Sequence, residues 1–340
     1  MPASECARSG SGVRLERILT DQMPSNAMSL RIAHKQEIAQ GITLFELRAG
    51  DGAALPPFTA GAHVALRTPN GFVRKYSMCN DPAEGDRYTI AVKREVSSRG
   101  GSVDLIDRAQ VGDTLSVAPP VNDFALPPRA TDMLFVAGGI GITPIMAMIQ
   151  QLQAEPDKHF RLFYCTRSPE VTAFLPELSV PEFKGKVKIH HDEGDPARAL
   201  DLWPILEQRK NREHLYCCGP RTLMQTVRDL TGHWSSTAVH FEAFTEPEKT
   251  KPDDRPFVVK LARSRAEFKV PVGTTILEAM RSHGCDTPSS CESGTCGTCR
   301  TKLLEGEADH RDLVLTEQEQ HDQIMICVSR AKSPKLVIDR

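Results

Sequence analysis

The sequence lacks the features that mark several broad classes of protein. Its 340 residues carry a formal net charge of only −2, without a basic stripe or interleaved basic and aromatic residues, so nucleic acid is not expected as a partner. The longest apolar run (133–149) is glycine-rich and broken by Pro144, which indicates strand, turn and helix rather than a membrane span. No signal peptide and no internal repeat are evident. We therefore expect a cytoplasmic protein, whose ten cysteines are thiols or ligands rather than disulfides.

The patterned sequence divides into three predicted domains. Residues 1–28 show no pattern and are expected to be a poorly ordered extension, so either Met1 or Met28 can be the start. In 29–127, short β-like runs alternate with turn signals, which predicts an antiparallel barrel or sandwich. In 128–245, apolar strands alternate with helical patterns, which predicts a parallel sheet covered by helices. After a charged linker (246–256), residues 257–340 contain a hairpin, a helix, a cysteine-rich loop and closing strands.

The cysteine-rich loop has the spacing of an iron–sulfur site. Three cysteines follow C-x4-C-x2-C and a fourth lies 28 residues further on: Cys291, Cys296, Cys299 and Cys327. This is the plant-type [2Fe–2S] spacing, and Gly294 and Gly297 let the backbone fold closely around a cluster. A structural zinc site is the alternative, but zinc ribbons usually carry two C-x2-C pairs and only one is present. A [2Fe–2S] cluster carries single electrons, so another cofactor must supply them.

Two motifs in the first domain favour a flavin. Segment 73–80, VRKYSMCN, offers a guanidinium fork, an aromatic ring and a hydroxyl from Arg74, Tyr76 and Ser77. The second motif joins a strand to a helix and combines an arginine, two glycines and a serine expected to be the N-cap, which together form an anion site: Arg99, Gly100, Gly101 and Ser102. An exposed strand arginine and a plain glycine turn are the alternative interpretation. An arginine at the anion site suits a terminal phosphate and favours FMN over FAD.

Two turns in the second domain favour a nicotinamide nucleotide. The segment 135–148, FVAGGIGITPIMAM, is a strand, a glycine turn and a helix, with Thr143 expected to cap the helix. It is not the G-x-G-x-x-G fingerprint, but the end of the first strand of an α/β unit suits a nucleotide. The later YCCGP (216–220) leaves room for a planar ring, although both segments also fit ordinary tight turns. Thr166 and Arg167 end a strand where NAD-selective folds often place an acid, so these residues leave NADH and NADPH both open.

These motifs together resemble the phthalate dioxygenase reductase family, within the ferredoxin–NADP reductase superfamily, from residue 29 to 340. The resemblance rests on the domain order and on RKYS, RGGS, GGIGITP, YCCGP, HFEAF, SSCESGTCGTC and MICVSRAKS. It implies an antiparallel β-barrel flavin domain, an α/β nucleotide-binding domain with a parallel sheet, and a C-terminal β-grasp ferredoxin domain. It also implies FMN, NADH and a [2Fe–2S] cluster as cofactors, and a Rieske-type oxygenase as electron acceptor. The chain would then be the reductase component of an aromatic-ring oxygenase system.

The resemblance also implies the site residues. Those for FMN are Arg74, Tyr76, Ser77, Val92, Lys93, Arg99, Gly100, Gly101, Ser102, Thr143 and Phe244. Those for NAD are Gly138, Gly139, Gly141, Thr143, Thr166, Arg167, Cys218, Gly219, Pro220, Phe241 and Glu242. No catalytic acid or base is expected, because the cofactors supply hydride and electron transfer.

Some alternatives stay open at this point. The same electron chain can serve an O-demethylating monooxygenase, and a non-redox binding protein with a structural zinc domain belongs to another class. Acidic residues near the cysteines can either steer a docking partner or form a solvated face: Glu292, Glu305, Glu307, Asp309 and Asp312. The oxygenated substrate and the oligomeric state do not follow from the sequence.

Overall fold

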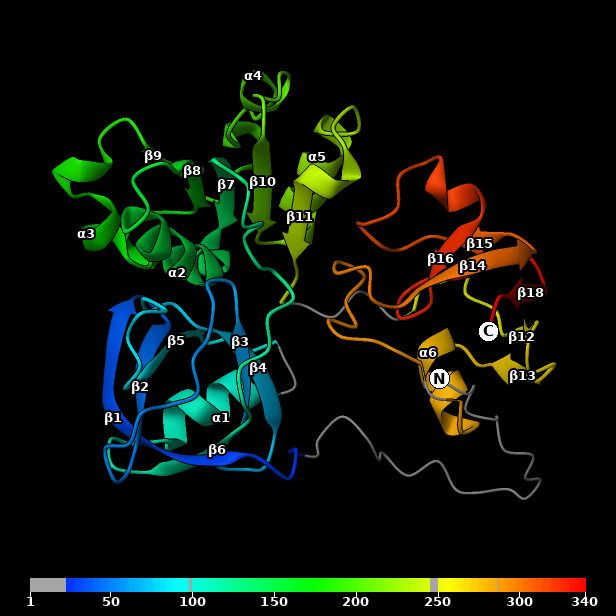
Figure 1. Cartoon of the computed structure of the whole chain (residues 1–340), viewed down its shortest axis with the longest axis horizontal. Helices are drawn as coiled ribbons and strands as arrows, with labels where there is room; N and C mark the ends of the chain where they lie inside the picture. Colours follow the sequence, from blue (N-terminus) through cyan, green and yellow to red (C-terminus); the bar gives the residue numbers. More distant parts are fainter. Residues whose placement is uncertain (1–22, 98–99, 245–249, 286) are drawn as a thin grey trace. The chain divides into compact units, whose positions relative to one another are not determined.

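The computed structural model describes residues 23–97, 100–244, 250–285 and 287–340 (Figure 1). This part of the chain forms two compact units, one ending at Leu223 and the other running from Met224 to Arg340. Each unit is described by itself. In the described ranges, no helix has both the length and the apolar character that crossing a bilayer requires.

The first unit begins with an antiparallel sheet of six strands in the order β4-β3-β6-β1-β2-β5. The strands are β1 (Met28–Ala39), β2 (Ile42–Ala49), β3 (His63–Arg67), β4 (Val73–Ser77), β5 (Tyr88–Lys93) and β6 (Thr114–Val117), and the helix α1 (Gly101–Arg108) follows β5. Alternate residues such as Leu30, Ile32, Phe45 and Leu47 are buried in one core, as expected for strands with one solvated face.

A barrel was expected for this domain. In the described residues, the antiparallel sheet has no ladder of hydrogen bonds between its edge strands β4 and β5. The chain just after β4 approaches β5 at a single bridge between Met78 and Ile90, next to a 2.9 Å hydrogen bond from the Cys79 N–H to the Thr89 carbonyl. The two edges therefore meet only at this end. The antiparallel flavin-type sheet is confirmed, and its hydrogen-bonded closure is limited to these contacts.

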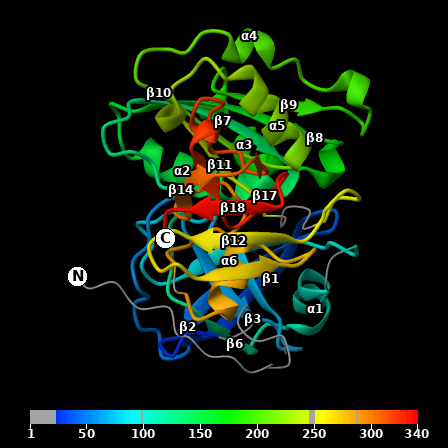
Figure 2. The same ribbon diagram turned by 90° about the vertical axis from the view of Figure 1, so that its right-hand side faces the viewer.

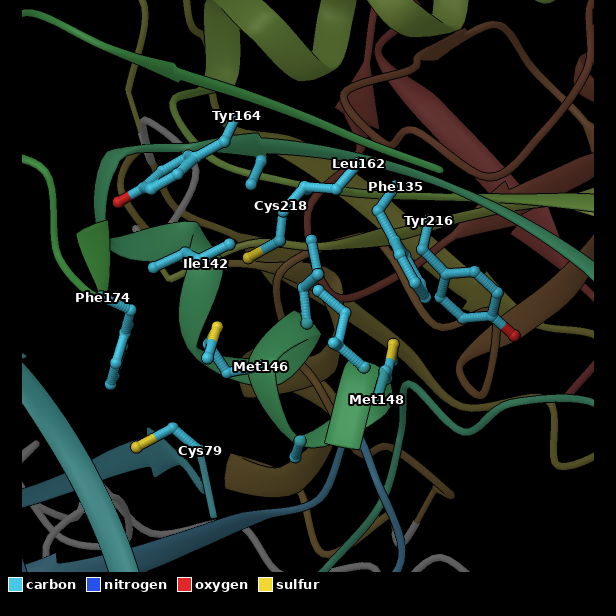
Figure 3. Packing of buried hydrophobic residues seen from close by; sticks show 14 of the residues in the cluster. Cys79, Phe135, Ile142, Met146, Met148, Leu162, Tyr164, Phe174, Tyr216 and Cys218 are labelled. Atoms are coloured by element: carbon cyan, nitrogen blue, oxygen red, sulfur yellow. The ribbon is translucent and has the colours of Figure 1, made fainter. Parts of the chain in front are cut away.

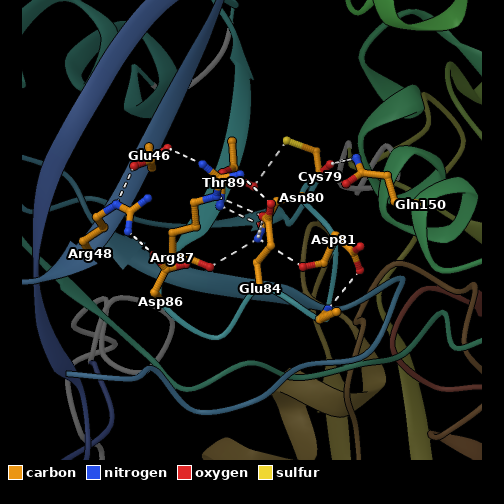
Figure 4. Close-up of polar contacts among 11 residues, drawn as sticks. Glu46, Arg48, Cys79, Asn80, Asp81, Glu84, Asp86, Arg87, Thr89 and Gln150 are labelled. Carbon is orange, nitrogen blue, oxygen red and sulfur yellow. Dashed lines mark hydrogen bonds and ion pairs between the residues drawn. The ribbon is translucent and has the colours of Figure 1, made fainter. Parts of the chain in front are cut away.

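The loop that follows β4 is fixed by one asparagine side chain. Asn80 accepts a hydrogen bond from the Thr89 N–H at 2.9 Å, and its amide group donates to Glu84 at 3.0 Å and to the Arg87 carbonyl at 3.2 Å. Arg87 also pairs with Glu84 and Glu46, so the loop is tied to β2 (Figure 4).

The parallel sheet predicted for the second domain is present. Its strands β7 (Asp132–Gly138), β8 (His159–Thr166), β9 (Val187–His191) and β10 (Glu213–Cys218) lie in the order β10-β7-β8-β9, with all three pairings parallel. After Asp132, every residue of β7 is buried, as expected for the central strand of a covered sheet. The helix α2 (Ile142–Gln153) covers it and buries all its residues from Ile142 to Ile149.

The other helices of this domain are shorter than their sequence patterns suggest. α3 (Leu175–Leu178) and α4 (Trp203–Leu206) each form about one turn, with Pro176 and Pro204 in that turn. Proline is tolerated in the first turn of a helix but not in its interior, so each helix begins at the residue before its proline. This domain also contains the 3-10 turns η1 (Gly139–Gly141), η2 (Pro169–Val171), η3 (Pro181–Phe183) and η4 (Pro196–Arg198). Two further 3-10 turns, η5 (Ser236–Ala238) and η6 (Glu319–His321), belong to the second unit.

The antiparallel and parallel sheets of the first unit share an apolar core. Met146 and Met148 of α2 lie among Phe135, Tyr216 and Cys218 of the parallel sheet, and Cys79 of the antiparallel domain joins the same cluster (Figure 3). Polar contacts also cross the boundary: for example, Gln150 donates to the Cys79 carbonyl at 2.9 Å, and the Tyr216 hydroxyl donates to the Ala125 carbonyl at 2.8 Å. The Gln150 contact is visible in Figure 4.

The second unit contains the C-terminal domain, whose sheet has the strand order β13-β12-β18-β14-β16. The unit comprises most of α5 (Arg221–Leu230), then β11 (Val239–Glu242), β12 (Phe257–Leu261), β13 (Glu267–Val270), α6 (Ile276–Ser282), β14 (Arg300–Glu305), β15 (Ala308–Asp309), β16 (Gln323–Met325), β17 (Arg330–Ala331) and β18 (Lys335–Ile338). β12 and β18 run parallel, side by side (Figure 2). α6 begins with a capping box of Thr275 and Glu278 and buries its apolar face in the core of this domain.

A charged network fastens the segment before β12 to this domain. Arg311 pairs with Asp254 and, at 2.6 Å, with Asp309; Arg330 lies 3.5 Å from Asp254 and donates to the Thr274 carbonyl at 2.6 Å. Burial raises the pKa of Asp254, but the arginines and the Lys251 N–H outweigh burial and hold that pKa below its usual value. Ionised Asp254 therefore stabilises the folded state.

We predict that Asp254→Asn destabilises the second unit by about 2 kcal/mol at neutral pH, less than the loss of a sole partner from a buried charge costs, since Arg311 keeps Asp309 as a partner. Because the pKa of Asp254 is lowered in the folded state, its contribution is present above the usual carboxyl pKa of about 3.9 and is lost as the pH falls through the folded value. Hydrogen exchange at β15 and β17 measures the effect. Asp339→Asn, which removes the exposed pair with Arg263, is the matched control and should change little. Equal effects of both variants would contradict the prediction.

Candidate functional site: a cysteine cluster and two nucleotide-type sites

The four cysteines predicted to ligate a cluster lie close together in the second unit. Three lie in the loop between α6 and β14, and Cys327 follows β16. A hydrogen bond between Cys291 and Cys296 lowers the pKa of Cys291 to about 4 and raises that of Cys296. A second hydrogen bond, between Cys299 and Cys327, lowers the pKa of Cys299 and raises that of Cys327. The charge of Cys291 also acts on both members of the second pair, so the two pairs are neighbours.

Backbone N–H groups of the loop point at the sulfur atoms. The Ser293 N–H donates to Cys291 Sγ at 3.4 Å, and the Gly294 N–H interacts with the Cys327 thiol. Gly294 has φ 76°, and a Cβ there would lie 2.7 Å from Val328 and 3.1 Å from the Asp312 Cα. The loop thus needs glycine to close, and it offers thiols and N–H donors together. This donor set fits a [2Fe–2S] cluster, whose potential depends on hydrogen bonds to sulfur.

The acidic residues near the cysteines are less available than the sequence suggests. Asp312 is only 2 % exposed, because its Oδ2 accepts hydrogen bonds from the N–H groups of Val314 and Leu315 at 3.0 and 2.7 Å. The expectation that Asp312 belongs to a docking or solvated face is therefore wrong. Glu292 pairs with Arg281 at 2.7 Å, and Asp309 belongs to the Arg311 network. Glu305 and Glu307 are exposed.

In the first unit, the two flavin motifs come together. Arg74 on β4 lies against the start of α1, since a Cβ on Gly101 would be 2.6 Å from Arg74 Nε. The guanidinium stacks over Phe72 at 5.2 Å and donates to the Val73 carbonyl at 2.8 Å. A charged fork beside the first turn of a helix suits a phosphate group. Arg99 lies outside the described residues.

The start of α1 differs from the prediction in one detail. Its N-cap is Gly100 with φ 85°, not Ser102, and no described side chain caps the helix. Ser102 is instead in the first turn, where its hydroxyl accepts a hydrogen bond from the Glu95 N–H at 3.1 Å. Glycine at the cap allows the positive φ, and the first-turn N–H groups keep their orientation for an anion. The expectation of a serine cap was wrong, but the anion-site geometry is retained.

The other flavin candidates lie on the neighbouring strands with different exposures. Tyr76 is half-buried beside Arg74, and burial strongly raises its pKa whereas the charge of Arg74 lowers it. Ser77 is buried opposite His63 in the β3–β4 ladder. Val92 is buried in the apolar core, so its side chain serves packing, whereas Lys93 is exposed and lies 3.3 Å from Glu95. For each of these residues, binding to FMN therefore stays a prediction.

One further residue of this region, Asp104, was not among the sequence predictions. Asp104, in α1, is 5 % exposed, and its Oδ2 accepts a hydrogen bond from the Asn70 N–H at 2.8 Å. It thereby ties the β3–β4 turn to the helix and contributes a charge near Tyr76. An acid in a first helical turn is ordinary, so sequence alone cannot distinguish this role.

The two nucleotide-type turns lie against each other at the carboxyl edge of the parallel sheet. A Cβ on Gly141 would be 2.2 Å from the Cys218 carbonyl oxygen, and one on Gly138 would be 2.6 Å from Pro220. A Cβ on Gly219 would be 2.9 Å from the Gly138 backbone. These glycines therefore allow the two turns to approach each other closely, because a side chain at any of them would clash. That edge is where α/β sheets bind nucleotides.

Several nucleotide candidates have roles that the sequence did not reveal. Thr143 is the second residue of α2, behind the N-cap Gly141, and donates to the Ile140 carbonyl at 3.1 Å, so the prediction that it caps the helix was wrong. The Thr166 hydroxyl forms hydrogen bonds with Thr172 at 2.7 Å and with His191 at 2.8 Å, so its hydrogen-bonding partners lie within the protein. The remaining candidates divide between the two units: Gly139, Arg167 and Cys218 lie in the first, and Phe241, Glu242 and Phe244 lie in the second, on or just after β11.

A surface cavity of about 510 Å³ lies away from these candidates. It is lined by residues around the amino ends of β7 and β10, including Arg129, Arg209, Arg212 and His214. It contains none of the predicted site residues, and nucleotide sites in parallel sheets lie at the opposite edge. We therefore place no cofactor there.

Comparisons with known proteins agree with these three regions. Residues 135–229 match the oxidoreductase NAD-binding domain, and residues 259–332 match the 2Fe-2S iron-sulfur cluster binding domain. The reductase subunit of phthalate 4,5-dioxygenase from Pseudomonas putida is 52% identical over 320 residues, which is 94% of this chain and 99% of that protein. The chain belongs to the phthalate dioxygenase reductase family.

Other relatives support the same assignment. Phthalate dioxygenase reductase from Burkholderia cepacia is 51% identical over 321 residues, covering 94% of this chain and all of that protein. A solved phthalate dioxygenase reductase, titled a modular structure for electron transfer from pyridine nucleotides to [2Fe–2S], is 52% identical, with a TM-score of 0.67 and coverage of 93% of this chain and 98% of that one. The chain is an NADH-dependent oxidoreductase with FMN and [2Fe–2S] as cofactors, as the resemblance implied. The zinc alternative has no support.

We predict that Gly141→Ala prevents the two turns from closing, because the added methyl would overlap the Cys218 carbonyl although the backbone of Gly141 is helical. Overpacking of this kind costs about 3 kcal/mol, and chemical unfolding followed by circular dichroism measures it. Gly139→Ala is the matched control: its φ of 52° is strained for alanine, at about 1 kcal/mol, but the site has open space. A Gly141→Ala variant as stable as Gly139→Ala would contradict the close approach.

Proposed function

We propose that this chain is the reductase component of a Rieske-type aromatic-ring oxygenase system. The two neighbouring cysteine pairs carry the proposal, because they lie in a segment that matches the 2Fe-2S iron-sulfur cluster binding domain, in a chain that also has an NAD-binding domain. The curated relatives that are 51–52% identical are named as reductases of phthalate dioxygenases. An aromatic acid is therefore the substrate class that the partner is proposed to oxidise.

When bound, FMN accepts a hydride from NADH and the [2Fe–2S] cluster carries electrons onward singly. The chain supplies binding and orientation. Arg74 and the first turn of α1, with Gly100, Gly101 and Ser102, hold the FMN phosphate. The facing turns of Gly138–Gly141 and Cys218–Pro220 form the nucleotide edge, and the four cysteines hold the two irons.

The Rieske-type partner has one competitor within the same chemistry. Vanillate O-demethylase oxidoreductase from Pseudomonas putida is 40% identical over 313 residues. An O-demethylating monooxygenase thus remains the second candidate partner, ranked below the dioxygenase by the lower identity. Cys285 is disulfide-bonded, so the expectation that no cysteine forms a disulfide is wrong. We also propose that the protein works in the cytoplasm, since eight described cysteines, including Cys79, Cys165 and Cys217, are free thiols.

We predict that Cys296→Ala abolishes NADH-dependent reduction of the cluster and delivery of electrons onward, while reduction of the flavin by NADH is unchanged. The change removes one of the four proposed ligands, and the flavin motifs lie in the other unit. Anaerobic stopped-flow spectroscopy with iron and acid-labile sulfide analysis measures both steps. Cys165→Ala is the control, because this thiol lies on β8 outside the loop. Persistent cluster reduction in Cys296→Ala would sink the ligand assignment.

The partner is tested by reconstitution. We expect the purified protein to support NADH-driven turnover of a Rieske-type phthalate-class dioxygenase at a higher kcat/KM for the reductase than it supports with a vanillate-class demethylase. The measurement is product formation at varied reductase concentration. Faster turnover with the demethylase would reverse the two candidates, and turnover with neither would reject the proposed partner class.

A further inference from the structure

One arginine joins the end of α5 to the loop that packs on the cysteine cluster. Arg228, in the last turn of α5, donates from Nη1 to the Asp312 carbonyl and from Nη2 to the Leu315 carbonyl, both at 2.9 Å. The guanidinium is thus a fork across two main-chain acceptors, a geometry that lysine cannot reproduce. Its charge also acts on the Asp312 carboxyl.

The segment that Arg228 holds is itself a rigid turn. Burial raises the pKa of Asp312, but His310 and the N–H groups of Leu315 and Val314 outweigh burial and lower it, so the carboxylate is ionised within the turn. The neighbouring Arg311 is fastened to Asp254. Arg228 therefore binds a segment with little freedom of its own.

This turn lies directly on the cysteine loop. The Leu313 N–H donates to the Gly294 carbonyl at 2.9 Å, and the Asp312 Cα would lie 3.1 Å from a Cβ on Gly294. The Gly294 N–H in turn interacts with the Cys327 sulfur. Three successive contacts thus connect the Arg228 guanidinium to a cluster ligand: Arg228 to the turn, the turn to Gly294, and Gly294 to Cys327.

The other end of α5 has a different neighbour in the sequence. The helix begins at Arg221, directly after the Cys218–Pro220 turn that the proposed function assigns to the nucleotide edge. The helix thus begins in the first unit, and its last turn, with Arg228, belongs to the second unit.

We propose that Arg228 is a positioning residue that fixes the turn 312–315, on which the cluster loop packs, to the end of α5. This inference rests on the proposed function, since it assigns a role within electron transfer. The fork orients the turn 312–315, and through Gly294 it sets the N–H donation to Cys327. Hydrogen bonds to sulfur favour the more negative, reduced state of a cluster, so this support raises the reduction potential.

Arg228→Gln tests the proposal in the holoprotein, with Arg263→Gln as the matched control. The control removes the same charge from an exposed arginine of the same unit that pairs with Asp339. We expect Arg228→Gln to lower the midpoint potential of the cluster in spectroelectrochemical titration, to slow cluster reduction by NADH about tenfold, and to increase hydrogen exchange at 312–315. The rate of flavin reduction and the properties of Arg263→Gln should match those of the wild type.

The possible outcomes separate this proposal from the proposed function. A wild-type potential and wild-type cluster reduction in Arg228→Gln would overturn it, as would equal shifts in Arg263→Gln. If the wild-type cluster is not reduced by NADH at all, the proposed function fails; the potential and the hydrogen exchange of Arg228→Gln still report whether the arginine holds the loop.

Discussion

The Gly141 backbone lies so close to the peptide of Cys218 that a Cβ would fall 2.2 Å from its carbonyl oxygen. The same constraint recurs in the other unit, where a Cβ on Gly294 would fall 2.7 Å from Val328. At both places the chain closes by backbone contact without an intervening side chain. The contact between the two nucleotide-type turns and the closure of the cysteine loop therefore both require glycine. A single added methyl group would be a large perturbation at either position.

Features set by local chemistry could be predicted from the sequence. The cysteine spacing predicted four thiols in one place, and the structure brings them together because glycine permits the positive φ that the loop needs. The alternation of strands and helices predicted the parallel sheet. Both signals lie within short segments and repeat at fixed intervals, so no distant partner is needed to interpret them.

Features set by distant partners could not be predicted. Ser102 and Thr143 have the chemistry of helix caps, but glycines with the required backbone geometry precede each helix and take the cap position. Thr166 resembles a nucleotide contact, yet Thr172 and His191 occupy its hydroxyl. In the sequence, Asp312 resembles a surface acid, but in the structure the turn that contains it buries its side chain. In each case a tertiary contact decides the role of a polar side chain, and the identity of that side chain gives no hint of the contact.

Most of the acidic residues near the cysteines are paired or buried, which changes the expected basis of partner recognition. Glu292 and Asp309 are held by arginines, and Asp312 is buried, so only Glu305 and Glu307 of the five acids stay exposed. Glu307 also lies 3.3 Å from Lys332. Paired surface charges generate a weak and strongly screened field. We therefore expect long-range steering by these acids to be modest and the proposed docking of an oxygenase to depend more on the shape of the cluster-bearing loop. The adjacent residues Arg311 and Asp312 fasten this loop to the Asp254 segment and to α5.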